Sequence, residues 1–297
     1  MCKISVVTPT YNRANFLENL YTSLQKQEFK NFEWLIIDDG SIDNTKDIVK
    51  KLINNLDMNI RYIYKENGGK HSALNIAIDN CKGELFFIVD SDDIVINGAL
   101  YKIVNTYELL ENKEEFCGIA GFRKDHNGNL LSNSINKDFV IANSIEAFYN
   151  LNLKGDKAEV FFTKILKKYK FPIFGDEKFL TEATLWNKIA NDGYLIKWIK
   201  EVFIEGEYIE GGLTKNSLNL FLNNSKGNLY YLNQESSYNI PIRYKIKCQA
   251  NYFRYGILAK NKLRNLIKES NLKYFSIITL PLGILGVFYT KFKLLKK

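Results

Sequence analysis

Short apolar runs alternate with helical patterns over the first 120 residues of the chain. Each run is followed by a segment in which apolar residues recur at every third or fourth position, which is the spacing of a helix. The pattern predicts strands at 4–7, 32–37, 60–64 and 85–89, and helices at 14–27, 43–56, 70–80 and 97–110. Strands and helices that alternate in this way indicate an α/β fold with a mainly parallel central sheet flanked by helices.

The remainder of the chain has a weaker pattern. We expect a strand at 119–123, a turn at 125–129, a helix at 183–191 and mainly helices after about residue 216. Because α/β sheets bind ligands at the carboxyl ends of their parallel strands, the residues that directly follow each early strand are the first candidates for chemistry.

Composition removes several classes of protein. Hydrophobic residues make up 46% of the 297 residues and charged residues 25%, which excludes a disordered chain. The four cysteines form no Cys-x-x-Cys pair and there are only two histidines, so zinc ribbons, disulfide scaffolds and histidine-rich metal sites are also excluded. A reducing cytosol fits this cysteine usage. The first seven residues contain no signal-peptide pattern, and we expect a cytoplasmic start.

The net charge of +8 is unevenly distributed. Residues 241–297 hold 13 basic residues and one acidic residue, a net +12, whereas residues 1–240 hold 28 basic and 32 acidic residues, a net −4. A basic tail suits an anionic partner, either nucleic acid or a membrane surface.

The tail also contains an apolar segment. Tyr274–Thr290 is 17 residues long without a charge and includes Pro281, and lysines follow it. An uncharged block is unsuited to tracking nucleic-acid phosphates, and its length is at the lower limit for a membrane span. We therefore predict an anchor on the membrane surface. The alternatives are a helix buried against the domain or a partner, and a true span.

Acidic clusters directly follow two of the predicted strands. Asp38 and Asp39 come after one, and Asp90, Asp92 and Asp93 come after another. Carboxylates at the end of a buried strand need hydrogen bonds or a cation, and such oxygen ligands suit Mg²⁺ or Mn²⁺ bridging to a diphosphate. The alternative is that these side chains cap the helices that follow. Two clusters at equivalent strand ends favour the ligand site.

Four motifs in order resemble the family 2 glycosyltransferases of the GT-A fold. They are Val6–Arg13, Ile36–Thr45, Asn67–Lys70 with Ala73 and Asn75, and Asp90–Asp93. The resemblance is strong over residues 3–115 and looser over 116–215. It implies a GT-A catalytic domain at 1–215, with a nucleotide-sugar-binding half at 1–115 and an acceptor half at 116–215. Residues 216–297 would form a helical, basic, membrane-associating region.

The resemblance also implies roles for individual residues. Tyr11 lies where the family packs the nucleobase, with Pro9 and Thr10 beside it; the alternative for Tyr11 is a packed core aromatic. Asp39 would accept a hydrogen bond from the base. Asp90 and Ser91 would bind the donor near the ribose, and Asp92 would hold the metal, while Asp93 is a supporting acid.

Lys70 follows a Gly-Gly pair that lets the backbone approach a ligand, and it could pair with a phosphate or contact the base. The alternative is a solvated lysine, although a cation is unfavourable in the first turn of a helix. The Gly-Gly pair in Tyr208–Thr214 indicates either a mobile loop that closes over the donor or a plain turn.

The catalytic base is expected in the second half of the chain. An inverting transferase needs a carboxylate that takes the proton from the acceptor hydroxyl. The family places an acidic pair before a Leu-Trp helix, and here that pair reads Thr181-Glu182. We predict that Glu182 is the base. The alternatives are that Glu182 only stabilises a helix N-terminus, or that Asp176 or Glu177 is the base.

The resemblance, with these residues, implies a metal-dependent inverting glycosyltransferase, a hexosyl- or N-acetylhexosaminyl-transferase. It would use a nucleotide-diphosphate sugar, with a UDP-sugar as the first candidate. The acceptor would be a glycan or a polyprenyl-diphosphate-linked oligosaccharide in bacterial surface polysaccharide synthesis. We expect the protein in the cytoplasm, on the inner face of the cell membrane, with no nucleic-acid partner. The alternatives are a nucleotidyltransferase that makes sugar nucleotides, and a non-catalytic membrane scaffold.

Overall fold

The computed structural model describes residues 2–55, 58–206 and 217–295. Contacts divide the chain into two compact units. The first unit comprises Met1–Phe171 and Asp192–Ile209, and the second comprises Pro172–Asn191 and Glu210–Lys297. Residues 172–191, from the predicted acceptor half, thus pack with the C-terminal helices. The predicted boundary at residue 215 separates a catalytic domain from a membrane-associating region. That functional division stays a prediction.

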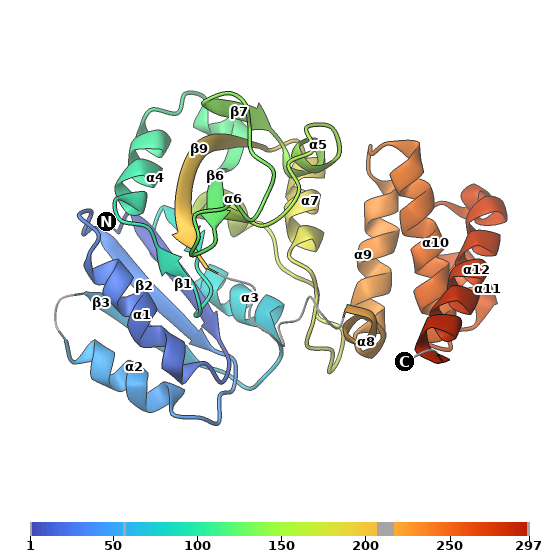
Figure 1. The fold of residues 1–297 in the computed structure, drawn as a ribbon, viewed down its shortest axis with the longest axis horizontal. Coiled ribbons are helices and arrows are strands. Elements are labelled where there is room, and N and C mark those ends of the chain that lie inside the picture. The colour runs from blue at the N-terminus through green and yellow to red at the C-terminus, as the bar shows by residue number, and fades with distance from the viewer. Residues whose placement is uncertain (1, 56–57, 207–216, 296–297) are drawn as a thin grey trace. The chain divides into compact units, whose positions relative to one another are not determined.

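The first unit is an α/β structure around one large sheet (Figure 1). Its strands are β1 (Ile4–Thr10), β2 (Phe32–Asp38), β3 (Asn59–Tyr64), β4 (Leu85–Ile88), β5 (Ile94–Val95), β6 (Phe116–Lys124), β7 (Phe139–Ala142), β8 (Lys157–Phe162) and β9 (Leu195–Glu205). Its helices are α1 (Ala14–Gln25), α2 (Thr45–Ile53), α3 (Lys70–Asn80), α4 (Ala99–Glu108), the short η1 (Lys113–Glu115), α5 (Ser144–Tyr149) and α6 (Thr163–Leu166).

The order of the strands is β3-β2-β1-β4-β8-β6-β9-β5, and β7 pairs with β9. The first four strands are parallel, as expected. β8 then runs antiparallel to both β4 and β6, while β6 and β9 are parallel. The α/β fold with flanking helices is confirmed, and the expectation of a mainly parallel sheet holds only for its first half.

The topology places a ligand site beside β1. The chain moves from β1 to β2 and β3 in one direction and then returns to β4 on the other side of β1. Because such crossovers are right-handed, α3 lies on the face opposite α1 and α2. The carboxyl ends of β1 and β4 therefore meet at the switch point where α/β sheets bind ligands.

A buried lysine begins β8, the central strand that joins the two halves of the sheet. The Lys157 side chain is 7% exposed, and its Nζ donates to the carbonyls of Lys154 and Gly155 at 3.1 and 3.3 Å. Burial lowers the pKa of Lys157 to about 8, although nearby Glu159 and Asp156 act to raise it.

This lowered pKa predicts a gain of stability in mild alkali. Between pH 8 and about 10.4 the unfolded lysine binds more protons than the folded one, so the free energy of unfolding rises with pH. Urea unfolding at pH 7.5 and 9.5 should show a gain of about 2 kcal/mol for the wild type over Lys157→Met. Lys50→Met, at a side chain that is 64% exposed, is the control and should behave like the wild type. Parallel pH profiles for wild type and Lys157→Met would contradict the assignment.

In its described residues the second unit consists of helices joined by loops, with no strand (Figure 1). It contains α7 (Ala183–Asn191), α8 (Ser217–Asn223), α9 (Ser225–Ser237), α10 (Ile242–Leu258), α11 (Leu263–Glu269), the short η3 (Lys273–Phe275) and α12 (Ser276–Leu295). Leu232, Tyr252, Phe253 and Leu266 form its apolar core. The buried Gln249 amide donates to the Ser236 hydroxyl at 2.6 Å and accepts from Ser270 at 3.0 Å, so the helices are also joined by satisfied polar groups.

Candidate active site

The loops after β1 and β2 are tied together by side-chain hydrogen bonds. The Asn12 backbone N–H donates to the Ser41 hydroxyl at 2.9 Å, and the Asn12 side-chain oxygen accepts from the Ile42 N–H at 2.9 Å. Asn12 has a φ of 51°, a conformation that asparagine tolerates better than most residues. The two loops therefore form one rigid edge beside the carboxyl end of β1.

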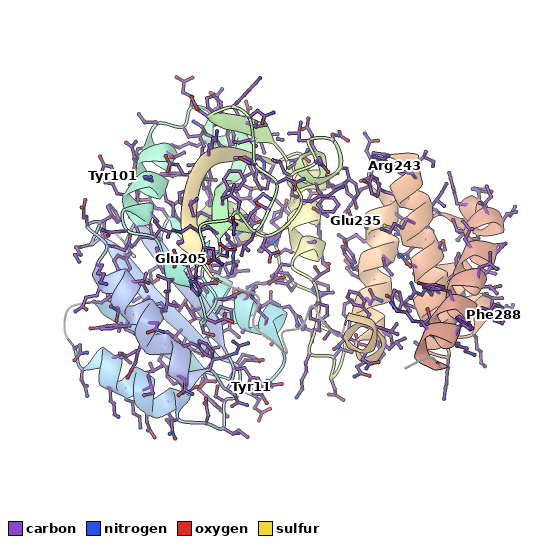
Figure 2. All side chains as sticks on the ribbon, viewed as in Figure 1. Tyr11, Tyr101, Glu205, Glu235, Arg243 and Phe288 are labelled. Atoms are coloured by element: carbon purple, nitrogen blue, oxygen red, sulfur yellow. The ribbon has the colours of Figure 1, made fainter. Side chains whose placement is uncertain are left out.

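This edge carries the first predicted donor-binding residues. Pro9 and Thr10 end β1, where they pair in register with Ile37 and Asp38. The Thr10 hydroxyl is buried and has no hydrogen-bond partner among the described residues. Tyr11 is 47% exposed (Figure 2), which excludes the alternative of a packed core aromatic. Its ring is open to a planar ligand.

Asp39 organises the Gly-Gly segment that precedes α3. One carboxylate oxygen accepts from the Lys65 ammonium at 2.6 Å and from the Gly68 N–H at 3.0 Å, and the other accepts from the Gly69 N–H at 2.7 Å. The side chain is almost fully buried. In this structure Asp39 therefore fixes the loop that begins α3, a role that the sequence did not indicate.

Asp39→Asn should loosen this segment. An amide keeps the shape but replaces one acceptor oxygen by a donor that faces N–H groups. We expect the free energy of unfolding to fall by about 2 kcal/mol, because hydrogen bonds to a charged group are lost. Denaturant unfolding checks this, with Asp47→Asn as the control, since the 72% exposed Asp47 carboxylate lies 3.9 Å from its Lys50 partner. Equal stability of the two variants would contradict the role.

The second acidic cluster follows β4, and its carboxylates form ion pairs with basic side chains. The Asp90 carboxylate lies 2.7 Å from the Lys70 ammonium, and the Asp92 carboxylate lies 2.7 Å from the Arg13 guanidinium. Although burial acts to raise it, the charges of Lys70, Arg123 and Arg13 hold the pKa of Asp90 below its usual range. The structure thus pairs Lys70 with Asp90, two residues from Asp92, and it adds Arg13 to the cluster.

Asp93 and Ser91 are more deeply buried. Burial raises the pKa of Asp93 to about 7, although the Arg123 guanidinium, at 2.6 Å from one carboxylate oxygen and 2.7 Å from the other, acts to lower it. The Asp93 N–H donates to the Asp90 carbonyl at 3.1 Å, which tightens the turn. Ser91 is 5% exposed. Asp93 therefore supports the turn that presents Asp90 and Asp92.

The cluster fits a divalent cation only with help from a ligand. The described residues contain no group of three acidic, histidine or cysteine side chains that could hold a metal ion alone. Mg²⁺ and Mn²⁺ accept carboxylate oxygens, and Mg²⁺ is commonly held by one or two carboxylates plus substrate phosphates. Asp90 and Asp92 supply that kind of donor set, which a diphosphate would complete.

The candidate base lies in the second unit. The Glu182 carbonyl accepts from the Leu185 and Trp186 N–H groups at 2.9 and 3.1 Å, so Glu182 stands at the start of α7. The alternative base Glu177 has a structural role, because its two carboxylate oxygens accept from the Lys226 and Gly227 N–H groups at 2.8 Å and cap α9. Asp176 is exposed.

Two cations that pair with the acidic cluster were not among the predicted site residues. Arg13 lies within the first motif and Arg123 near the end of the apolar strand β6, but nothing in the sequence paired them with the acidic cluster.

Asn75 has a structural role, because its side chain exchanges two hydrogen bonds of 2.9 Å with the backbone of Phe171. These bonds fix Phe171, the last residue of the segment Met1–Phe171, against α3. The Gly-Gly loop at Tyr208–Thr214 lies outside the described residues.

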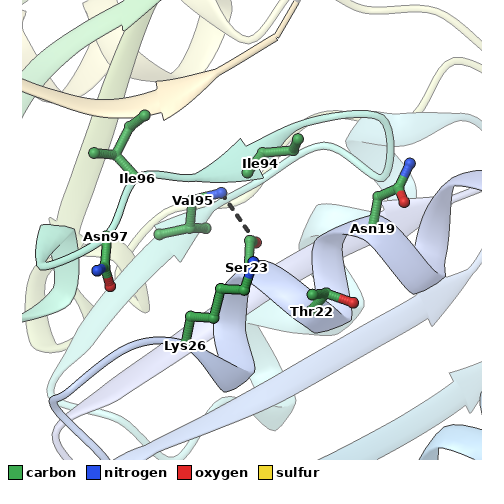
Figure 3. A pocket seen from close by; sticks show the side chains of 8 residues that line it. All are labelled: Asn19, Thr22, Ser23, Lys26, Ile94, Val95, Ile96 and Asn97. Atoms are coloured by element: carbon green, nitrogen blue, oxygen red, sulfur yellow. Dashed lines mark hydrogen bonds between the residues drawn. The ribbon is translucent and has the colours of Figure 1, made fainter.

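A pocket of about 320 Å³ opens between α1 and β5 (Figure 3). Asn19, Ser23, Lys26 and Ile96 are among its lining residues, and the Val95 N–H donates to the Ser23 hydroxyl at 3.1 Å there. None of the predicted site residues lines this pocket. The acidic cluster and its cations therefore remain the candidate active site.

Comparison with solved structures establishes the fold family. The chain superposes on Staphylococcus aureus TarS with a TM-score of 0.59, at 20% identity, covering 96% of this chain and 49% of that one. It superposes on the mannosyltransferase PcManGT of Pyrobaculum calidifontis, in complex with GDP-Man and Mn²⁺, with a TM-score of 0.57 at 15% identity, covering 97% and 88% of the two chains. The expected GT-A fold is thereby confirmed.

Curated relatives are similar to part of the chain. A GalNAc(5)-diNAcBac-PP-undecaprenol beta-1,3-glucosyltransferase of Campylobacter jejuni is 31% identical over 202 residues, which are 63% of this chain and 59% of that protein. The poly(ribitol-phosphate) beta-N-acetylglucosaminyltransferase TarS of S. aureus is 33% identical over 133 residues, 44% of this chain and 20% of that protein. The chain thus spans less than two thirds of the length of these relatives.

The family model described as glycosyl transferase family 2 matches residues 5–170, more than half of the chain. This range contains every predicted site residue except Glu182. The resemblance found in the four motifs is confirmed, and the chain belongs to glycosyl transferase family 2.

Proposed function

We propose that this protein is a metal-dependent inverting glycosyltransferase that moves a hexosyl or N-acetylhexosaminyl group from a UDP-sugar to a hydroxyl. The observation that carries the proposal is the Asp90–Asp92 pair at the carboxyl end of β4, with Lys70 and Arg13 each 2.7 Å from one carboxylate. A site with two carboxylates and two cations can bind both a divalent metal and a diphosphate.

The donor and metal proposals draw on the relatives. TarS residues 1–349 have been solved in complex with UDP-GlcNAc, and this chain superposes on that structure with a TM-score of 0.57. PcManGT was solved with GDP-Man and Mn²⁺. Mg²⁺ or Mn²⁺ is accordingly the cofactor we propose, held by Asp92 with help from Asp90. When bound, the metal would neutralise charge on the leaving nucleoside diphosphate.

The chain's own residues would perform the rest of the reaction. The Tyr11 ring would stack on the base, and Pro9, Thr10 and Asp39 would line its position beside β1. Arg13 pairs with one oxygen of Asp92 in this structure, so the guanidinium would compete with a cation for that carboxylate, and it would pair with the donor phosphates once the cation is bound. Lys70 would stabilise the same charge from the first turn of α3.

Glu182 would act on the acceptor. As the base, its carboxylate would accept the hydroxyl proton while the acceptor oxygen attacks the anomeric carbon from the side opposite the nucleotide. Attack from that side inverts the anomeric centre in one step, and no covalent intermediate with the protein is formed.

The acceptor we propose is a glycan, carried on a polyprenyl diphosphate, in the synthesis of a bacterial surface polysaccharide. The C. jejuni relative is named for an undecaprenol-linked substrate, and residues 241–297 carry a net charge of +12 that suits an anionic membrane. The protein would then work in the cytoplasm, on the inner face of the cell membrane.

Donor binding is the first test. Purified protein with Mn²⁺ or Mg²⁺ would be screened against UDP-, GDP-, dTDP- and CMP-sugars by thermal shift and nucleotide release. We expect a metal-dependent shift with a UDP-sugar, followed by transfer to a polyprenyl-diphosphate-linked glycan. Pyrophosphate release from a nucleoside triphosphate and a sugar phosphate would instead indicate a nucleotidyltransferase. No response to any nucleotide would favour a non-catalytic scaffold.

A further inference from the structure

α12 packs its small residues inward. At Gly283, an added Cβ would lie 2.7 Å from the Phe253 Cβ, and at Gly286 it would lie 2.9 Å from the Arg254 Cδ. The Arg254 Nε donates to the Thr290 hydroxyl at 2.9 Å. Glycines and a threonine thus let α12 lie very close to α10, and the same inward side also holds Leu280 and Val287.

Most of the large apolar residues of α12 point the other way. Leu285 is 64% exposed and Phe288, labelled in Figure 2, is 66% exposed. Ile277, Ile278, Leu282 and Phe292 are exposed on the same helix. A helix on the surface of a protein in water has the opposite arrangement, with apolar residues inward and polar residues outward. A contiguous apolar surface of this kind marks a binding face.

The surroundings of this face are basic. Lys273 precedes α12, and Lys291 and Lys293 lie in its last turns. Glu269 is the only acidic residue between positions 241 and 297. Apolar side chains bordered by lysines complement an anionic lipid surface, which offers hydrocarbon beneath negatively charged headgroups.

The packing on α10 also determines how α12 can meet a bilayer. Lys273–Lys293 is long and apolar enough to cross a membrane by length and composition alone, and 28% of its 18-residue apolar stretch is buried within the protein. A crossing helix would take α10 with it, together with Arg243, Lys245, Lys247 and Arg254, into the hydrocarbon, where charges are costly. Contact along one face avoids this cost.

We propose that α12 lies in the plane of an anionic phospholipid surface, with Leu285, Phe288 and their apolar neighbours inserted below the headgroups. The inference rests on the proposed function, since it explains how a lipid-linked acceptor would be reached. The partner of this face is a lipid bilayer, into which the apolar side of α12 would insert to a depth of about 5–10 Å.

Vesicle co-sedimentation of the full chain tests the proposal. We expect binding to vesicles of phosphatidylglycerol and phosphatidylcholine, and at least tenfold weaker binding to phosphatidylcholine alone. Leu285→Asp with Phe288→Asp should weaken binding to the anionic vesicles at least tenfold, because two large apolar side chains are removed. The matched control is Tyr101→Asp with Leu109→Asp, at exposed apolar residues of the first unit (58% and 70%), and it should bind like the wild type. Absence of wild-type binding, or equal loss in both double variants, would overturn the proposal.

Depth measurement separates an in-plane helix from a span. Leu282 lies in the middle of the uncharged stretch, so Leu282→Trp reports the depth of its centre. In-plane binding predicts stronger quenching by lipids brominated at carbons 6 and 7 than by lipids brominated at carbons 11 and 12. The reverse order would overturn the in-plane arrangement in favour of a span.

These measurements use no donor, metal or acceptor. A failure of vesicle binding would leave donor binding at Asp92 intact, and a failure of donor binding would leave the vesicle result intact. Release of UDP from a UDP-sugar in detergent-free buffer should be the same for the wild type and for the Leu285→Asp, Phe288→Asp variant.

Discussion

Asp92→Asn should lower kcat/KM for sugar transfer on the order of a thousandfold, with the protein still folded. Asparagine keeps the size of the side chain and loses the negative charge that a divalent cation requires. It also leaves the Arg13 guanidinium without the carboxylate that it contacts at 2.7 Å. Steady-state transfer assays in Mn²⁺, together with Mn²⁺ titration followed by electron paramagnetic resonance, check both consequences.

Two further variants make this result specific. Asp47→Asn, on the exposed surface of α2, removes an equal charge and should transfer like the wild type. Arg13→Gln should bind Mn²⁺ more tightly than the wild type when no nucleotide is present, because the competing guanidinium is gone, and should bind the UDP-sugar more weakly. If Asp92→Asn retains both Mn²⁺ binding and transfer, Asp92 is not the metal ligand.

Glu182→Gln should lower kcat by about 10²–10⁴-fold while donor binding is retained. The amide cannot accept the proton of the acceptor hydroxyl, whereas Tyr11, Asp90 and Asp92 remain unchanged. The thermal shift produced by a UDP-sugar with Mn²⁺ should therefore equal that of the wild type. Combining the two readouts distinguishes a lost base from a lost donor site.

Glu177→Gln is the matched control, since Glu177 is the nearby acid that the structure assigns to capping. Its carboxylate accepts from the Lys226 and Gly227 N–H groups, so the amide should cost about 1 kcal/mol of stability and leave kcat unchanged. Full transfer activity in Glu182→Gln, with loss of activity in Glu177→Gln, would show that the base had been assigned to the wrong residue.

The first half of the sheet could be predicted because its strands are simple. β1, β2 and β4 are short, largely apolar and almost completely buried, and β1 and β2 are each directly followed by a helix with one apolar side. β9 differs, since Lys197, Lys200 and Glu201 interrupt its apolar residues and its register with β6 shifts at irregularities. Because a β-bulge changes which side chains face the core, a strand paired through such irregularities has no single alternation for the sequence to display.

The residues of the candidate donor site could be proposed from residue types and their order. Acidic clusters after β2 and β4, the Gly-Gly segment before Lys70 and the family motifs all lie within short stretches of chain. Their partners come from far along the chain, since Asp92 meets Arg13, Asp93 meets Arg123 and Asp39 meets Lys65. Such ion pairs depend on which strands are neighbours, and strand order is not a local property.

The tail shows the same division between local and long-range information. Its charge, its uncharged stretch and its helical character follow directly from the order of the amino acids. Which side of α12 faces inward required the packing on α10, because Gly283 and Gly286 accept the close approach of a second helix that lies about thirty residues earlier in the chain. The local sequence determines that the segment is helical, apolar and basic. Contacts with α10, far away in the sequence, determine which face of α12 is exposed for binding.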